Sequence, residues 1–78
     1  MFKRDDILYF VKHGNNEVVR LLVEKVLANG MIYVINPKNT FTHWLTDKDL
    51  ERAFHTEIEA VRFVNKVEND SSSEQRRY

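Results

Sequence analysis

Two threonine capping boxes follow one another in the second half of the chain, at Thr46–Asp49 and at Thr56–Glu59. In such a box the threonine hydroxyl accepts a hydrogen bond from an N–H of the first helical turn. The carboxylate three residues later reaches back to the N–H of the threonine. The boxes therefore predict two helix starts: a short helical corner after Thr46 and a longer helix after Thr56.

The residues after Thr56 have the pattern of an amphipathic helix. Glu57 and Glu59 suit the positive end of its dipole, and Lys66 suits the negative end. An apolar stripe at helical spacing is formed by Ala60, Phe63, Val64 and Val67, and Ile58 and Val61 widen it. We therefore predict a helix from about Glu57 to Val67 that packs against the core.

Turn signals divide the segment before these boxes. Asn29-Gly30 is typical of a two-residue hairpin, and Asn36–Asn39 contains a proline turn. Between them, Met31–Ile35 is rich in β-branched and aromatic residues, and Thr40–Leu45 has a similar composition. Two strands are predicted here, and in the second one Trp44 points to the face opposite Phe41 and Leu45.

The first part of the chain fits two structures. Residues 17–28 have apolar positions at helical spacing, but they also alternate as a long, bent strand would. Residues 6–13 also fit either a buried strand or a short helix. We favour strands in both segments, because two strands alone make a marginal sheet. The predicted fold is mainly β with a C-terminal α-helix, in a small barrel of four to five strands. An α+β fold with an N-terminal helical hairpin, a two-stranded hairpin and a C-terminal helix stays open.

With these strands, the chain resembles the small SH3-like (Tudor/KOW-like) barrel proteins of bacterial and phage genomes. In these proteins a helical corner precedes a pattern of the form Leu-Phe-x-Thr-x-x-Glu-Ala. This sequence matches the pattern at Phe54, Thr56, Glu59 and Ala60, and residues 51–53 separate the leucine from the phenylalanine. The resemblance implies an SH3-like barrel that acts as an accessory or inhibitor protein of a phage or another mobile element.

The length and composition predict one domain and a tail. Residues 1–67 are predicted to form a single small globular domain. Residues 68–78 are almost entirely polar, so we expect them to form a disordered tail. A domain of this size buries only about 60% of its unfolded surface, which leaves little room for an enclosed active site.

The balanced charge argues against a dedicated nucleic-acid binder, and the absence of cysteine excludes sites that depend on thiols. Twelve basic and twelve acidic residues give a formal net charge of zero, whereas nucleic-acid binders usually have a basic excess. The chain contains no cysteine, which excludes disulfides and thiolate metal sites. Neither a leader peptide nor a membrane span is evident, so we expect a cytoplasmic protein without membrane association.

The remaining titratable residues do not form a catalytic pattern. His13, His43 and His55 are not at metal-ligand spacing. Asp47 and Asp49 fit a capping role, and the sequence has neither a phosphate-binding glycine loop nor a nucleophile motif. We therefore expect a protein that is not an enzyme and that uses no metal and no cofactor.

Aromatic residues are the best candidates for a binding site. We predict a partner-binding face with Trp44 at its centre and with Tyr33, Tyr9 and Arg20 around it, because aromatic residues and arginine are frequent binding anchors. The favoured partner is another protein. The alternative is a nucleic acid, because exposed aromatic rings also stack on bases.

Overall fold

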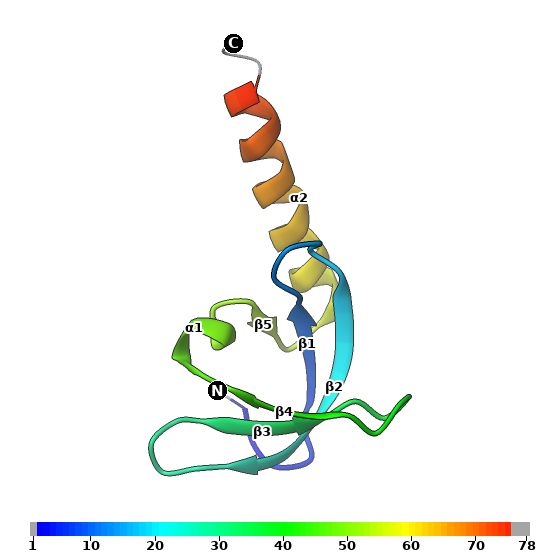
Figure 1. The fold of residues 1–78 in the computed structure, drawn as a ribbon, viewed down its shortest axis with the longest axis vertical. Helices are drawn as coiled ribbons and strands as arrows, with labels where there is room; N and C mark the ends of the chain where they lie inside the picture. Colours follow the sequence, from blue (N-terminus) through cyan, green and yellow to red (C-terminus); the bar gives the residue numbers. More distant parts are fainter. Residues whose placement is uncertain (1, 76–78) are drawn as a thin grey trace.

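The computed structural model describes the backbone of residues 2–75 and the side chains of residues 2–69. Five antiparallel strands form one sheet, and a long helix follows them (Figure 1). The strands are β1 (Ile7–Val11), β2 (Val18–Val26), β3 (Ile32–Ile35), β4 (Thr42–Leu45) and β5 (Ala53–Phe54). The helices are α1 (Asp47–Leu50) and α2 (Glu57–Gln75). The chain is therefore mainly β with a C-terminal helix, as the sequence predicted. The helical-hairpin alternative is wrong, because most of residues 17–28 form β2.

The central strand β2 bends the sheet. The strand order is β4-β3-β2-β1-β5, so β4 and β5 are the two edges of an open sheet over the described residues. The first half of β2, Val18–Leu22, pairs with β1, and the second half, Leu22–Val26, pairs with β3. The register shifts between Val23 and Lys25, and such a bulge bends a strand and increases its twist. As a result, β3 and β4 run across the direction of β1 (Figure 1).

The main core lies on the inner side of this bend. Side chains alternate between the two faces of a strand, and the inner positions are the buried ones. They are Leu8, Leu21, Val23, Ile32, Val34 and Leu45. Phe10 and Val19 are partly buried and pack against them, as does Leu50 of α1.

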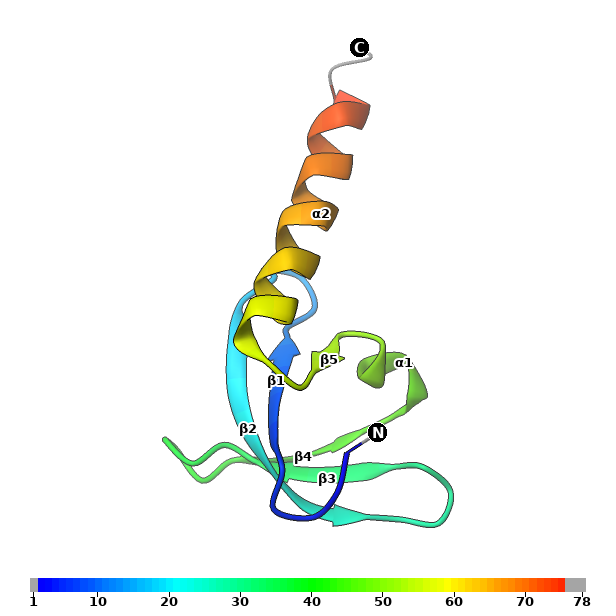
Figure 2. The ribbon, with the colours of Figure 1, turned by 180° about the vertical axis from the view of Figure 1, so that it is seen from behind.

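A second, smaller apolar contact lies on the outer side, beneath α2. Val11 of β1 and Ala60 of α2 are fully buried, and the rings of Phe54 and Phe63 are 5.3 Å apart between their centroids. The helix packs on β1, β5 and the beginning of β2 and then projects beyond the sheet (Figure 2). Ala60 and Phe63 of the predicted apolar stripe therefore anchor α2 to the outer face, whereas Ile58 and Val61, which were predicted to widen the stripe, are exposed.

The ends of several elements differ from the sequence-based ones. The strand β4 starts at Thr42 because Thr40 has a left-handed φ of 59°, which belongs to the preceding turn. The two-residue strand β5 was not predicted. The helix α2 continues past the predicted end at Val67 to Gln75. It thus enters the segment for which a disordered tail is predicted, of which residues 76–78 lie outside the described residues. Disorder of this tail stays a prediction.

The first capping box forms as expected, whereas in the second the Glu59 carboxylate accepts a hydrogen bond from the Thr56 hydroxyl. The Thr46 N–H donates to Asp49 Oδ2 over 3.0 Å at the start of α1. At the start of α2, the Glu59 N–H donates to Thr56 Oγ1 over 3.3 Å. These bonds satisfy backbone groups that have no partner inside the helix, so the two boxes set where each helix begins.

Candidate partner-binding surface

Tyr33, which is partly buried, and Trp44, which is exposed, form an aromatic pair on the outer side of β3 and β4. They are opposite each other in the register of the two strands. Their ring centroids are 4.6 Å apart, and the rings are tilted by 43°. The neighbouring position Leu45 is buried in the inner core, whereas Trp44 is 46% exposed. The exposure of Trp44 and Leu45 follows the predicted alternation, but Phe41 and His43, which share the face of Leu45, are exposed as well.

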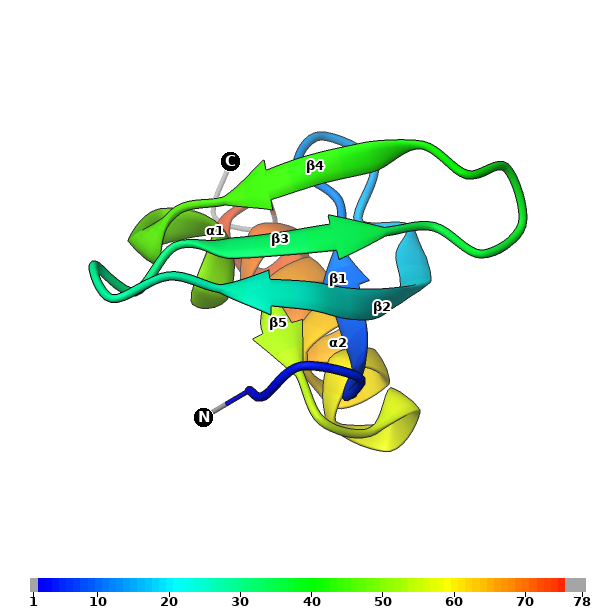
Figure 3. The same cartoon turned by 90° about the horizontal axis from the view of Figure 1, so that it is seen from below.

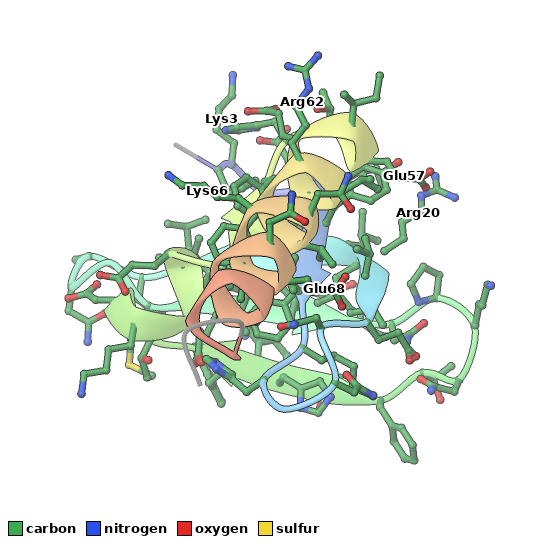
Figure 4. The ribbon with its side chains drawn as sticks, turned by 90° about the horizontal axis from the view of Figure 1, so that it is seen from above. Lys3, Arg20, Glu57, Arg62, Lys66 and Glu68 are labelled. Atoms are coloured by element: carbon green, nitrogen blue, oxygen red, sulfur yellow. The ribbon has the colours of Figure 1, made fainter. Side chains whose placement is uncertain are left out.

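Tyr9 and Arg20 lie at a different place on the outer side. They are opposite each other on β1 and β2, and they line a hollow of about 580 Å³ that reaches the β3–β4 turn and the start of α2. Figure 4 shows Arg20 beside Glu57, the first residue of α2. The structure therefore brings the four predicted site residues together as two pairs, Tyr33 with Trp44 and Tyr9 with Arg20.

A cleft on the inner side of the sheet was not predicted from the sequence. Its volume is about 400 Å³, and one wall comes from β1 and β2 while the other comes from β4 and the residue before it. Phe41 is 66% exposed, which leaves an aromatic ring uncovered at this site. Apolar walls with a few polar groups at the rim are typical of binding clefts. The lining includes Phe10, Val19, Leu21, Phe41, His43, Trp44 and Leu45, with Lys12, His13 and Asp49 among its polar members.

An imidazole–carboxylate pair stands at the rim of this cleft. His13 Nε2 is 3.1 Å from Asp49 Oδ1. This contact joins the β1–β2 turn, where His13 lies, to α1, where Asp49 lies. The backbone N–H of Thr46, which donates to the Asp49 carboxylate, lowers the pKa of that carboxyl group, and His13 contributes in the same direction. Asp49 therefore has two roles, as the capping acid of α1 and as the partner of His13.

The side chain of Arg52 holds the β1–β2 turn in place through hydrogen bonds. Its Nε donates to the Val11 carbonyl oxygen over 2.9 Å, and its Nη2 donates to Asn16 Oδ1 over 2.6 Å. The guanidinium carbon also lies 5.1 Å from the centre of the Phe63 ring. In the sequence, Arg52 was only an interruption between a leucine and a phenylalanine. In the structure, this side chain connects the turn beside the cleft to the helix α2.

The histidines of the described residues lie in three separate places. Within residues 2–69, no three His, Asp or Glu side chains come together as a metal site would require. The three histidines are in separate environments: His13 is next to Asp49, His43 is on β4, and His55 stacks on Phe2 with ring centroids 4.2 Å apart. Neither helix of the described part is long and apolar enough to cross a bilayer.

Comparison of the chain with protein-family models, with curated proteins and with solved structures finds no match.

Proposed function

We propose that this chain is a small non-catalytic module that binds another protein through the surface around Tyr33 and Trp44. The observation that carries the proposal is the exposure of the Trp44 ring on an edge strand, next to a second aromatic ring. Tryptophan and tyrosine give a large contact area at a low cost in conformational entropy, and they are enriched among the residues that dominate binding energies.

The proposal includes an SH3-like barrel as the finer description of the fold. Three features support it: the bend of β2, the helical corner α1 before β5, and the capping threonine before α2. As the resemblance implies, we propose an accessory or inhibitor protein of a phage or another mobile element that works in the cytoplasm.

The charge distribution favours a protein partner over a nucleic acid. Figure 4 shows Arg62 and Lys66 on α2 and Lys3 on the N-terminal segment near it. The helix packs on β1, β2 and β5, which places these basic residues around the other half of the sheet from the aromatic pair. Binding of nucleic acids depends on basic side chains that contact phosphates. Near the aromatic pair, Lys25 lies opposite Tyr33 on β2, and Lys12 lines the same cleft as Trp44.

A pull-down with quantitative mass spectrometry tests the proposal. The wild-type chain, Trp44→Ala and the control Ile58→Ala are used as baits in the same lysate; Ile58 is 65% exposed on α2. We expect the wild type and Ile58→Ala to capture the same partner and Trp44→Ala to lose it, while thermal melts show that all three fold. A folded Trp44→Ala variant that retains the partner would contradict the proposed site.

A gel-shift assay at two salt concentrations tests the alternative. A complex with nucleic acid that weakens steeply as salt increases would favour the nucleic-acid function. We expect no shift for the wild-type chain at either concentration.

A further inference from the structure

The strand β4 presents a free backbone edge. Among residues 2–75, it is at the end of the sheet and pairs with β3 alone (Figure 3). Thr42, His43 and Trp44 are all exposed. Natural sheets often protect such an edge with lysine or proline, but Thr42–Leu45 contains neither. The backbone of β4 is therefore accessible to another strand.

A hydrogen bond at the β3–β4 turn decides which backbone groups of β4 face outward. The Asn36 N–H donates to the Phe41 carbonyl oxygen over 2.8 Å. Bonded and non-bonded residue pairs alternate along an antiparallel ladder, so His43 exchanges hydrogen bonds with β3, whereas Thr42 and Trp44 do not. The N–H and C=O groups of Thr42 and Trp44 therefore point away from the sheet.

The pairing of β3 with β2 also shows that the backbone groups of Trp44 point outward. The Leu27 N–H donates to the Met31 carbonyl oxygen over 2.9 Å at the β2–β3 turn. Bonded and non-bonded pairs alternate from that bond along the two strands. The next pair, Val26 and Ile32, is therefore non-bonded, and the one after it, Lys25 and Tyr33, is bonded. The backbone groups of Tyr33 thus point to β2, which leaves its partner across β4, Trp44, with outward-pointing groups.

These outward groups match a particular kind of occupant. Two N–H and two C=O groups, two residues apart on an edge strand, are satisfied by an extended backbone. A helix already uses its own backbone groups, so it cannot supply them along its length. The occupant is therefore an extended segment of chain.

The side chains of that segment can also be placed. Alternate side chains of an added strand point to opposite faces of the sheet. One set would lie beside Trp44 on the outer side, and the other would lie on the side of the cleft, where Phe41, His43 and Phe10 are found. Both sides offer aromatic or apolar contacts, so the complementary segment has aliphatic or aromatic residues.

We propose that β4 binds an extended apolar segment of another protein by strand addition, with hydrogen bonds to the backbone of Thr42 and Trp44. This inference rests on the proposed function, because both use the same strand. It adds the conformation of the partner, the register of the contact and the side-chain chemistry that the partner presents.

Amide hydrogen exchange of the full chain, followed by NMR, tests the register directly. The probe is a pool of short capped synthetic peptides with valine, leucine, isoleucine or phenylalanine at positions on both faces of the strand and threonine at the two ends. We expect the peptides to slow exchange at Thr42 and Trp44 by about tenfold or more, because new hydrogen bonds protect these amides. The amide of His43 serves as the internal reference and should change little, since it is already bonded to β3. The same peptides with methylated backbone nitrogens should have no effect.

Two variants separate this inference from the proposed function. Thr42→Pro removes an outward N–H without removing a hydrogen bond to β3, and an edge strand tolerates proline at a position of this kind. Thr42→Val is the matched control, because it keeps the backbone N–H. We expect Thr42→Pro to lose both the peptide and the captured partner and Thr42→Val to retain them, with melts as the folding control. If Trp44→Ala loses the partner but a folded Thr42→Pro retains it, binding uses side chains and strand addition is overturned.

Three results of the exchange experiment on the wild-type chain overturn the inference whether or not Thr42→Pro folds. The first is no protection of Thr42 and Trp44 by any peptide of the pool. The second is equal protection by the methylated peptides. The third is protection that increases with protein concentration in the absence of peptide, which would make a second copy of this chain the occupant.

Discussion

Trp44 lies directly opposite Tyr33, with their ring centroids 4.6 Å apart, on the half of the sheet away from α2. The helix covers the outer face of β1 and β5, where it buries Val11 and Ala60. The same outer side thus has a covered half, which stabilises the fold, and an uncovered half, which carries the aromatic pair. This division is the basis for separating changes that affect stability from changes that affect binding.

Removing the charge of Asp49 should destabilise the domain in a pH-dependent way. We expect Asp49→Asn to lower the free energy of unfolding by about 1 kcal/mol at neutral pH, as for other capping residues. The pKa of Asp49 is lowered in the folded state, so its contribution is present above the unfolded pKa of about 3.9. The contribution disappears as the pH falls through the lower folded value. Urea unfolding of both chains at neutral and acidic pH measures this.

Asp47→Asn is the matched control for that experiment, because Asp47 is an exposed acid in the same first turn of α1. We expect the stability difference between wild type and Asp49→Asn to shrink at acidic pH. A difference that stays constant from neutral to acidic pH would mean that the carboxylate charge does not stabilise the corner.

Replacing Arg52 should cost more stability than replacing an exposed arginine. Arg52→Ala removes charge-assisted hydrogen bonds to the Val11 carbonyl and the Asn16 side chain, and we expect a loss of about 2–3 kcal/mol. Arg62→Ala, at an exposed position of α2, should cost less than about 0.5 kcal/mol. Chemical denaturation compares the two, and equal losses would show that Arg52 does not hold the turn.

The Phe63 ring should be the main anchor of α2. We expect Phe63→Ala to destabilise the domain by about 3 kcal/mol, the lower end for truncating a phenylalanine, because the ring is only partly buried. The exposed Val61 on the same helix is the control, and Val61→Ala should cost much less. A melting temperature that is the same for both variants would make the helix peripheral to the core.

The end of the chain should contribute little to stability. The apolar stripe of α2 ends at Val67, so we expect a chain that lacks residues 71–78 to melt at the same temperature as the full chain. Differential scanning calorimetry of the two chains checks this. A clear loss of stability on truncation would contradict the tail prediction.

Local signals in the sequence predicted most of the fold. Asn29-Gly30 marked the β2–β3 turn, the two threonine boxes marked the starts of α1 and α2, and alternation placed Trp44 on the outer side. The strand β5 was missed because two residues carry no periodic pattern, and its existence depends on pairing with β1.

The candidate site was predicted in part, for a physical reason. Alternation shows which face of a strand a residue occupies but not its position across the bent sheet, so Tyr9 and Arg20 were grouped with Trp44 although they line a different hollow. The contact between His13 and Asp49 joins residues that are 36 positions apart. Such long-range contacts depend on how the sheet bends, which no local pattern specifies.

The fluorescence of Trp44 tests the central claim most directly. The chain contains a single tryptophan, and this residue is 46% exposed in the free protein, so the tryptophan emission reports on the surroundings of Trp44. When the protein captured in the pull-down is added, preferably in a form without tryptophan, we expect the emission to shift to shorter wavelength and quenching by acrylamide to decrease. An unchanged emission maximum and unchanged quenching in the saturated complex would show that Trp44 stays in water and that the partner binds elsewhere.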